Sequence, residues 1–170
     1  MSILKDFRFT VEVKGNAERV VELTTDQGLA LSVATPAEFR GGVHGMWSPE
    51  HLLVASAASC FALTLAGIAE RRQIPLHDVA ISGVGHITRR ADARFGFVVV
   101  ELAVEITTEE GFEENARRAA RAAETGCLIA QALILAVVLH RLVSHLKEAW
   151  PIGLTEVAYQ NAAAYAKAYI

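Results

Sequence analysis

Apolar and polar residues alternate in short runs along the first third of the chain, which predicts an antiparallel meander of three strands. In the first run, over residues 7–13, Phe and Val alternate with charged or polar residues, as in a strand with one buried face. Turn-forming residues separate this run from extended runs at 19–24 and 29–33. Residues 35–47 hold one Pro and three Gly and are expected to form a loop.

A long helix is predicted next, from Ser48 to about residue 72. Ser48 offers a capping hydroxyl, Pro49 suits the first helical position, and Glu50 suits the positive end of the helix dipole. Basic residues occupy the predicted last turn, and Pro75 ends the helix.

The rest of the chain predicts two strands and a second helix. Strands are expected at 79–88 and 95–107, and residues 109–123 place Phe and Ala along one helical stripe with Arg on the other side. The apolar segment 128–146 fits a buried helix or a buried strand equally well. The Ala- and Tyr-rich last ten residues predict a C-terminal helix. This order of strands and helices indicates an α+β fold, with antiparallel sheets around a long buried helix.

Composition narrows the class of protein. The chain has 170 residues, 52% of them hydrophobic, so we expect one compact domain over residues 1–170. A formal charge of −3 and a pI near 6.1 argue against a nucleic-acid partner. Residues 52–69 carry no charge and reach the lower length limit of a membrane span. Ala and Ser supply nearly half of that segment and no basic flank orients it, which favours a core helix and no membrane partner. No signal peptide precedes it, so the cytoplasm is expected.

Two cysteines are the main candidates for chemistry. Cys60 lies in the long predicted helix, and Cys127 follows Gly126 at a predicted helix start, where the dipole lowers a thiol pKa. Each also fits a small buried core residue, and this alternative stays open. The cysteines are 67 residues apart and the six histidines are scattered, so neither a metal nor a cofactor is expected.

Other motifs are weaker. His44 and His51 are possible bases for a Cys–His pair, but no motif supports that role, and surface positions are the simpler reading. Gly83 and Gly85 lack the third glycine and the following helix of a dinucleotide-binding fingerprint.

A family resemblance emerges from three segments taken together. The Phe-Arg-Gly-Gly stretch at 39–42 is followed by Trp-Ser-Pro-Glu-His-Leu-Leu at 47–53 and by Ala-Ala-Ser-Cys at 57–60. The second cysteine then opens a Cys-Leu-Ile segment within 126–133, where the family more often has Cys-Pro-Val. The chain thus resembles the OsmC/Ohr family of osmotically inducible and organic-hydroperoxide-resistance proteins, over a core of about residues 5–145. Residues 150–170 form an extension without an assigned role.

The resemblance implies a thiol peroxidase that reduces organic hydroperoxides and works as an intertwined homodimer. Cys60 would attack the peroxide, and Cys127 would form a disulfide with it. An external dithiol, usually on a lipoyl-bearing protein, would reduce that disulfide. Glu50 would hold an activating arginine, and both Arg19 and Arg40 fit that part. Two alternatives remain: an OsmC-like dimer without peroxidase activity that binds an apolar small molecule, and a non-enzymatic dimer whose cysteines only pack the core.

Overall fold

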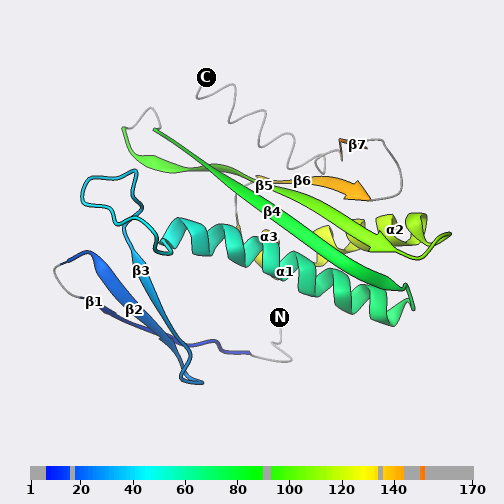
Figure 1. Ribbon diagram of the computed structural model, residues 1–170, viewed down its shortest axis with the longest axis horizontal. Helices are drawn as coiled ribbons and strands as arrows, with labels where there is room; N and C mark the ends of the chain where they lie inside the picture. The colour runs from blue at the N-terminus through cyan, green and yellow to red at the C-terminus, as the bar shows by residue number, and fades with distance from the viewer. Residues whose placement is uncertain (1–6, 16–17, 90–92, 134–135, 144–149, 152–170) are drawn as a thin grey trace, which may run out of the picture. The chain divides into compact units, whose positions relative to one another are not determined.

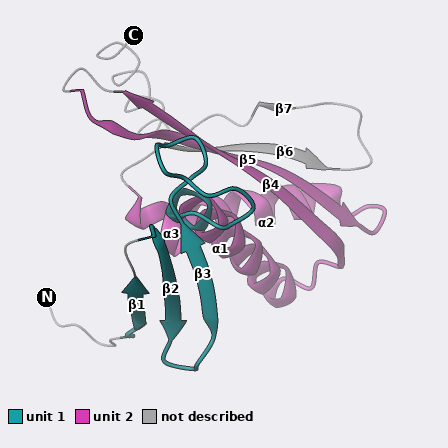
Figure 2. Cartoon of the chain, turned by 60° about the vertical axis from the view of Figure 1, so that its left-hand side comes forward, with its two compact units in different colours: residues 1–52 teal, residues 53–170 magenta. Residues whose placement is uncertain are grey.

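The computed structural model describes residues 7–15, 18–89, 93–133, 136–143 and 150–151. The chain divides into two compact units, an N-terminal unit over Met1–Leu52 and a C-terminal unit over Leu53–Ile170 (Figure 2). The C-terminal helix predicted for the last ten residues lies outside the described residues. The expectation of one domain over the whole chain stays a prediction.

The N-terminal unit is built on the predicted antiparallel meander. Its strands β1 (Val11–Gly15), β2 (Val20–Thr25) and β3 (Ala30–Ala34) form a sheet in that order. Gly28 closes the second turn with a φ of 79°, a backbone angle that favours glycine. The first strand differs from its prediction, because it begins at Val11 and all of its residues are exposed. Its alternation of apolar and polar residues therefore has no buried face within the described single chain.

Helix α1 spans Pro49–Arg71, as its end signals predict. The Ser48 hydroxyl accepts the backbone N–H of His51 at 3.3 Å and thereby caps the first turn. Five residues of α1 are buried along one side: Ala57, Phe61, Leu65, Ile68 and Ala69. Leu63, by contrast, is 74% exposed, so the helix is not buried all round within one chain. By length and composition alone α1 is also the one helix, among the residues described, that could cross a membrane, which is weak evidence for a span.

The C-terminal unit contains a four-stranded sheet with the order β4-β5-β6-β7 (Figure 1). Strands β4 (Leu76–Arg89) and β5 (Phe95–Thr108) pair antiparallel and confirm the two predicted strands. Strand β6 (Ala136–Val143) lies parallel to β5, and β7 (Trp150–Pro151) is antiparallel to β6. The inner face of β5 supplies much of the core through Val100, Leu102, Val104 and Ile106.

Helix α2 (Glu113–Gly126) buries the predicted alanine stripe, namely Ala116, Ala119, Ala120 and Ala123. It begins four residues later than the predicted start at 109. Gly111 adopts a φ of 87° there, which forms a turn and prevents an earlier helical start. Beyond Cys127, the ambiguous segment contains the short helix α3 (Leu128–Ala132) before the chain enters β6.

Two glycines of β4 let helix α1 approach the sheet closely. A Cβ atom added to Gly83 would lie 2.7 Å from Cγ1 of Val54 on α1, and one added to Gly85 would lie 2.8 Å from Cγ2 of the same side chain. Real Cβ atoms do not come this close to a neighbour. These glycines therefore serve helix–sheet packing.

Candidate functional site

Cys60 lies within helix α1 and is half-buried. It lies next to Phe61, which packs into the core of the C-terminal unit. The side chain of Thr64, one helical turn further along, lies close to the chain at Gly126, since a Cβ atom there would be 3.4 Å from the Thr64 methyl. Helix α1 and the turn after α2 therefore meet around this cysteine.

Cys127 links helices α2 and α3. It ends α2 and begins α3 with extended backbone angles (φ −70°, ψ 112°), as the Gly126–Cys127 pair predicts. Its sulfur accepts the backbone N–H of Ala130 at 3.4 Å and so caps α3. The side chain is buried and, like Cys60, is a free thiol.

The two thiols lie close enough to shift each other's pKa. Burial opposes ionisation of Cys60, but hydrogen bonds from the Ile129 N–H, the Cys127 thiol, the Thr64 hydroxyl and the Leu128 N–H together lower the pKa of Cys60. Donors that point at a sulfur stabilise its thiolate. All of these donors are uncharged, so the turn around Cys127 favours the Cys60 thiolate without a cation.

The two thiols are shifted in opposite directions. Burial raises the pKa of Cys127, and the neighbouring Cys60 sulfur raises it further, against hydrogen bonds from the backbone of Ala130 and Ile129. The expectation that the helix start lowers the Cys127 pKa is therefore wrong, because desolvation outweighs the donors of a five-residue helix. This arrangement makes Cys60 the more readily ionised of the two thiols.

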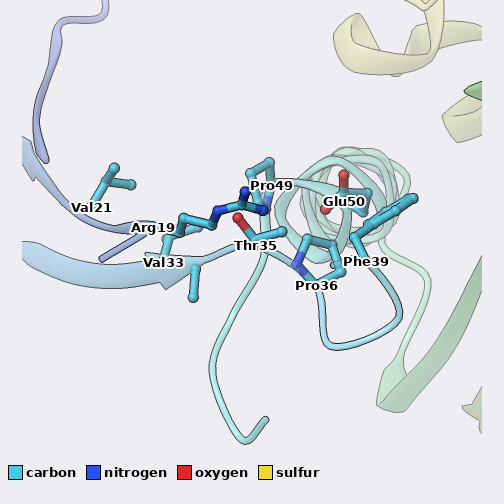
Figure 3. Close-up of a pocket in the computed structure, with 9 residues that line it drawn as sticks. Arg19, Val21, Val33, Thr35, Pro36, Phe39, Pro49 and Glu50 are labelled. Carbon is cyan, nitrogen blue, oxygen red and sulfur yellow. The ribbon is translucent and has the colours of Figure 1, made fainter. Parts of the chain in front are cut away.

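A second candidate site lies wholly within the N-terminal unit. It is a cavity of about 410 Å³ whose lining includes Arg19, Glu50 and the apolar side chains of Val21, Val33 and Phe39 (Figure 3). Of the two candidate arginines, only Arg19 lines this cavity. Its side chain extends toward Thr35 and Pro49 in the figure.

Glu50 lines the same cavity as Arg19. The predicted ion pair between the two side chains is not among the contacts of the described residues. Oε2 of Glu50 is buried and has no hydrogen-bond partner among the described residues. The Arg19 guanidinium instead donates to the backbone carbonyl of Arg40. An unpaired buried carboxylate oxygen is costly, which is typical of a site that accepts a further group.

Sequence reasoning missed three contributors to these sites. Thr64 could have been found, because residues four apart on a helix lie on one face. The donors at Leu128 and Ile129 are backbone groups and leave no sequence signal. His51 bonds through Nδ1 to the Ser48 hydroxyl at 2.9 Å, so its structural partner is the helix cap. Among the described residues, no group of three or more His, Cys, Asp or Glu could hold a metal ion.

Fold and site together define a class of protein: an α+β chain in which a thiol inside a long helix interacts with a second thiol in a later turn. The sequence model of OsmC-like proteins matches residues 42–140, more than half of the chain. The chain therefore belongs to the OsmC-like protein family, which confirms the resemblance seen in its motifs.

Solved structures agree with this assignment. An OsmC-like protein of unknown function from Vibrio cholerae superposes with a TM-score of 0.73 at 17% identity, over 81% of this chain and 100% of that one. An organic hydroperoxide resistance protein from Elizabethkingia anophelis gives 0.68 at 21% identity, over 85% and 100%. One from Legionella pneumophila gives 0.67 at 25% identity, over 84% and 99%. No protein with a curated description matches the chain.

Proposed function

We propose that this protein is a cysteine-based peroxidase that reduces organic hydroperoxides. Its family includes organic hydroperoxide resistance proteins, and it has two neighbouring thiols with opposite pKa shifts. The thiol pair is the observation that carries the proposal, because a peroxidase of this kind needs one thiolate and one protonated partner. An organic substrate is favoured since the cavity that holds Arg19 has mostly apolar walls.

In the first step the Cys60 thiolate attacks the hydroperoxide. A sulfur–oxygen bond forms, the oxygen–oxygen bond breaks, and the leaving alkoxide takes up a proton to become an alcohol. Cys60 is then a sulfenic acid. Cys127 condenses with it, so that a disulfide forms and water leaves. An external dithiol, such as a lipoyl group on a partner protein, then returns two electrons and restores both thiols.

Arg19 is the arginine we assign to peroxide attack, with Glu50 as its orienting carboxylate. A guanidinium stays charged and can fork onto a carboxylate, so it can stabilise developing negative charge. We expect Arg19→Ala to slow attack at least about tenfold, or about 1.4 kcal/mol of barrier. Glu50→Ala slows attack as well but leaves the disulfide product unchanged. If Arg40→Ala is the slower of the two arginine variants, the assignment is wrong.

The test is to count thiols after cumene hydroperoxide is added to the reduced protein. The parent should lose both thiols and show an intramolecular Cys60–Cys127 disulfide in non-reducing, denaturing mass spectrometry. Cys127→Ser should consume one equivalent and leave a trappable sulfenic acid on Cys60, whereas Cys60→Ser should not react. Absence of the intramolecular disulfide in the parent would sink the two-cysteine mechanism.

A second candidate function is binding of an apolar small molecule without turnover. The apolar walls and the unpaired Glu50 oxygen of the cavity favour it. In that case thiols persist in the peroxide assay, and a fluorescent apolar probe binds in a manner that Val33→Asp abolishes. Thiol loss that depends on Cys60 rejects it as the main function.

A further inference from the structure

The backbone around Arg19 is held in an unusual conformation. Arg19 has a φ of 60°, in the left-handed region that non-glycine residues seldom adopt. Its carbonyl accepts the N–H of Thr35 at 3.2 Å, which ties the turn before β2 to the loop after β3. Strain of this kind persists only where surrounding contacts enforce it, and it is concentrated at functional positions.

The loop over residues 39–42 contacts the Arg19 guanidinium at Arg40 and Gly41. Phe39 donates its N–H to the Pro36 carbonyl at 3.0 Å, and Gly42 donates to the Phe39 carbonyl at 2.9 Å, so two successive turns build the loop. The carbonyl of Arg40 then points at the Arg19 guanidinium and accepts a hydrogen bond from it. Gly41 has a φ of 78°, and a Cβ atom there would lie 3.1 Å from Cζ of Arg19.

We propose that this loop is a positioning device for Arg19, in which the Arg40 carbonyl orients the guanidinium and Gly41 leaves the space it occupies. Arg40 therefore contributes its main chain and not its charge. A carbonyl is a neutral acceptor, so it fixes the direction of the guanidinium without neutralising it, as a carboxylate would. The remaining donors of the fork stay available for an anionic group. The importance of this device for turnover rests on the proposed function.

The first test reads the position of Arg19 without any peroxide. Phenylglyoxal labels arginine side chains, and peptide mass spectrometry reports the labelling rate of Arg19 separately. In Gly41→Ala the guanidinium must shift by a few tenths of an ångström away from the new Cβ, which weakens its bond to the Arg40 carbonyl. Arg19 should then be labelled faster than in the parent, by up to about three to ten times, the factor of one net hydrogen bond.

Gly45→Ala is the matched control for this test. Gly45 lies in the same loop region with a φ of 74°, but no atom lies within 4 Å of a Cβ placed there. It therefore imposes the same backbone strain without touching Arg19. In Gly45→Ala, Arg19 should be labelled at the same rate as in the parent. Equal labelling of Arg19 in Gly41→Ala and Gly45→Ala would overturn the proposal.

The second test measures peroxide attack on Cys60. Gly41→Ala should slow attack about tenfold in the parent but have no further effect in Arg19→Ala, because there is no guanidinium left to displace. An equal effect in both backgrounds means a general structural defect and overturns the proposal. If Arg19→Ala itself leaves attack unchanged, the assigned role of Arg19 in the peroxidase fails, and the labelling test alone then decides on the positioning device.

Arg19→Lys gives an answer even if Gly41→Ala does not fold. Lysine keeps the positive charge but lacks the planar fork that bonds the Arg40 carbonyl while presenting other donors. Attack about tenfold slower than in the parent supports orientation as the role of the loop. Attack at the parental rate shows that charge alone suffices and contradicts it.

Discussion

At the scale of single residues, the candidate site holds two chemically identical groups whose pKa values are shifted in opposite directions. Donors from the backbone and from side chains lower the pKa of Cys60 against the effect of burial, whereas burial raises the pKa of Cys127. Apart from the Cys60 sulfur itself, which raises the Cys127 pKa, no charged side chain is among the groups that set either shift. The same turn therefore makes Cys60 the more readily ionised of the two thiols.

This imbalance predicts two separate pH profiles for alkylation. Because the pKa of Cys60 is lowered and that of Cys127 is raised, the reaction rate of Cys60 with iodoacetamide should level off at a lower pH than that of Cys127, with the ordinary thiol value of about 8.5 as the reference. The pKa of Cys127 is raised, so its rate should still climb above that pH. Peptide mass spectrometry between pH 6 and 10 separates the two. The shape of each profile is compared, since burial lowers the absolute rate at Cys127. Coincident midpoints would contradict the imbalance.

Leu128→Pro is a clean deletion of one donor to Cys60. Position 128 is the first residue of α3, where proline is tolerated, and Cys127 before it has the extended backbone that proline requires. The leucine side chain is 77% exposed, so little packing is lost. Without this N–H the pKa of Cys60 should rise and alkylation at pH 7 should slow, by roughly tenfold for a hydrogen bond to a charged group.

Leu128→Ala is the control, because it removes the side chain but keeps the N–H. Its alkylation profile should follow the parent. If alanine and proline at 128 change the Cys60 profile equally, the side chain matters and the N–H does not.

The sequence predicted the participants of the site better than their arrangement. The motif around Cys60 and Glu50 was sufficient to name both cysteines and the carboxylate as candidates, and their roles stay predictions. It left Arg19 and Arg40 equivalent, because a left-handed backbone at Arg19 and a carbonyl that accepts its guanidinium are tertiary features. The lowered pKa of Cys60 was attributed to a cation for the same reason. Backbone donors carry no residue identity.

At the scale of elements, the contact of α1 with β4 depends on the absence of two side chains. Val54 is β-branched and restricted to few rotamers in a helix, so it cannot turn away from an added methyl on Gly83. This close packing explains Gly83 and Gly85, which do not belong to a nucleotide-binding motif. Their place in a strand is otherwise unfavourable.

Gly83→Ala should therefore destabilise the protein by roughly 1–3 kcal/mol, the usual cost of overpacking. Urea unfolding followed by circular dichroism measures this. In a Val54→Ala background the Cγ1 methyl that interferes most is gone, so the cost of Gly83→Ala should fall, although Cδ2 of Leu102 still lies 3.1 Å from the new Cβ. A cost that is equal in the two backgrounds would mean that the steric account is wrong.

Element limits were predictable where local chemistry sets them. Ser48, Pro49 and the basic last turn defined α1 from sequence alone. Helix α2 was predicted too early because Glu109 and Glu110 resemble acidic first-turn residues, and a sequence pattern does not reveal the positive φ of Gly111. Residues 128–146 were ambiguous because periodicity cannot distinguish a helix from a strand in a continuous apolar run.

At the scale of the whole molecule, apolar side chains remain uncovered in the described chain. Phe9 is 92% exposed, and Val11, Val13 and Leu63 are also exposed. Isolated monomers seldom leave several large apolar side chains in water. We expect a second copy of the chain to cover at least part of them.

The homodimer is therefore a prediction for solution measurement. Sedimentation at micromolar concentration should give twice the 18.3 kDa mass of the chain. Leu63→Glu places a charge on the exposed side of α1 and should shift the protein toward monomer, whereas Leu128→Glu, on an exposed residue of α3, should not. A stable monomer of the parent under these conditions would refute the dimer.

The sulfur of Cys127 has one more consequence, because it also caps helix α3. In the proposed disulfide this sulfur would bond to Cys60, and we expect it then to release the Ala130 N–H and the cap to be lost. Helix α3 has five residues, none of them buried, so its helical order can be lost at little cost in free energy. In the proposed mechanism, the oxidation state of the buried Cys127 sulfur would thus determine whether the helical turn of α3 is ordered. Under the proposed mechanism, oxidised and reduced molecules would therefore differ at the surface in the shape of that turn.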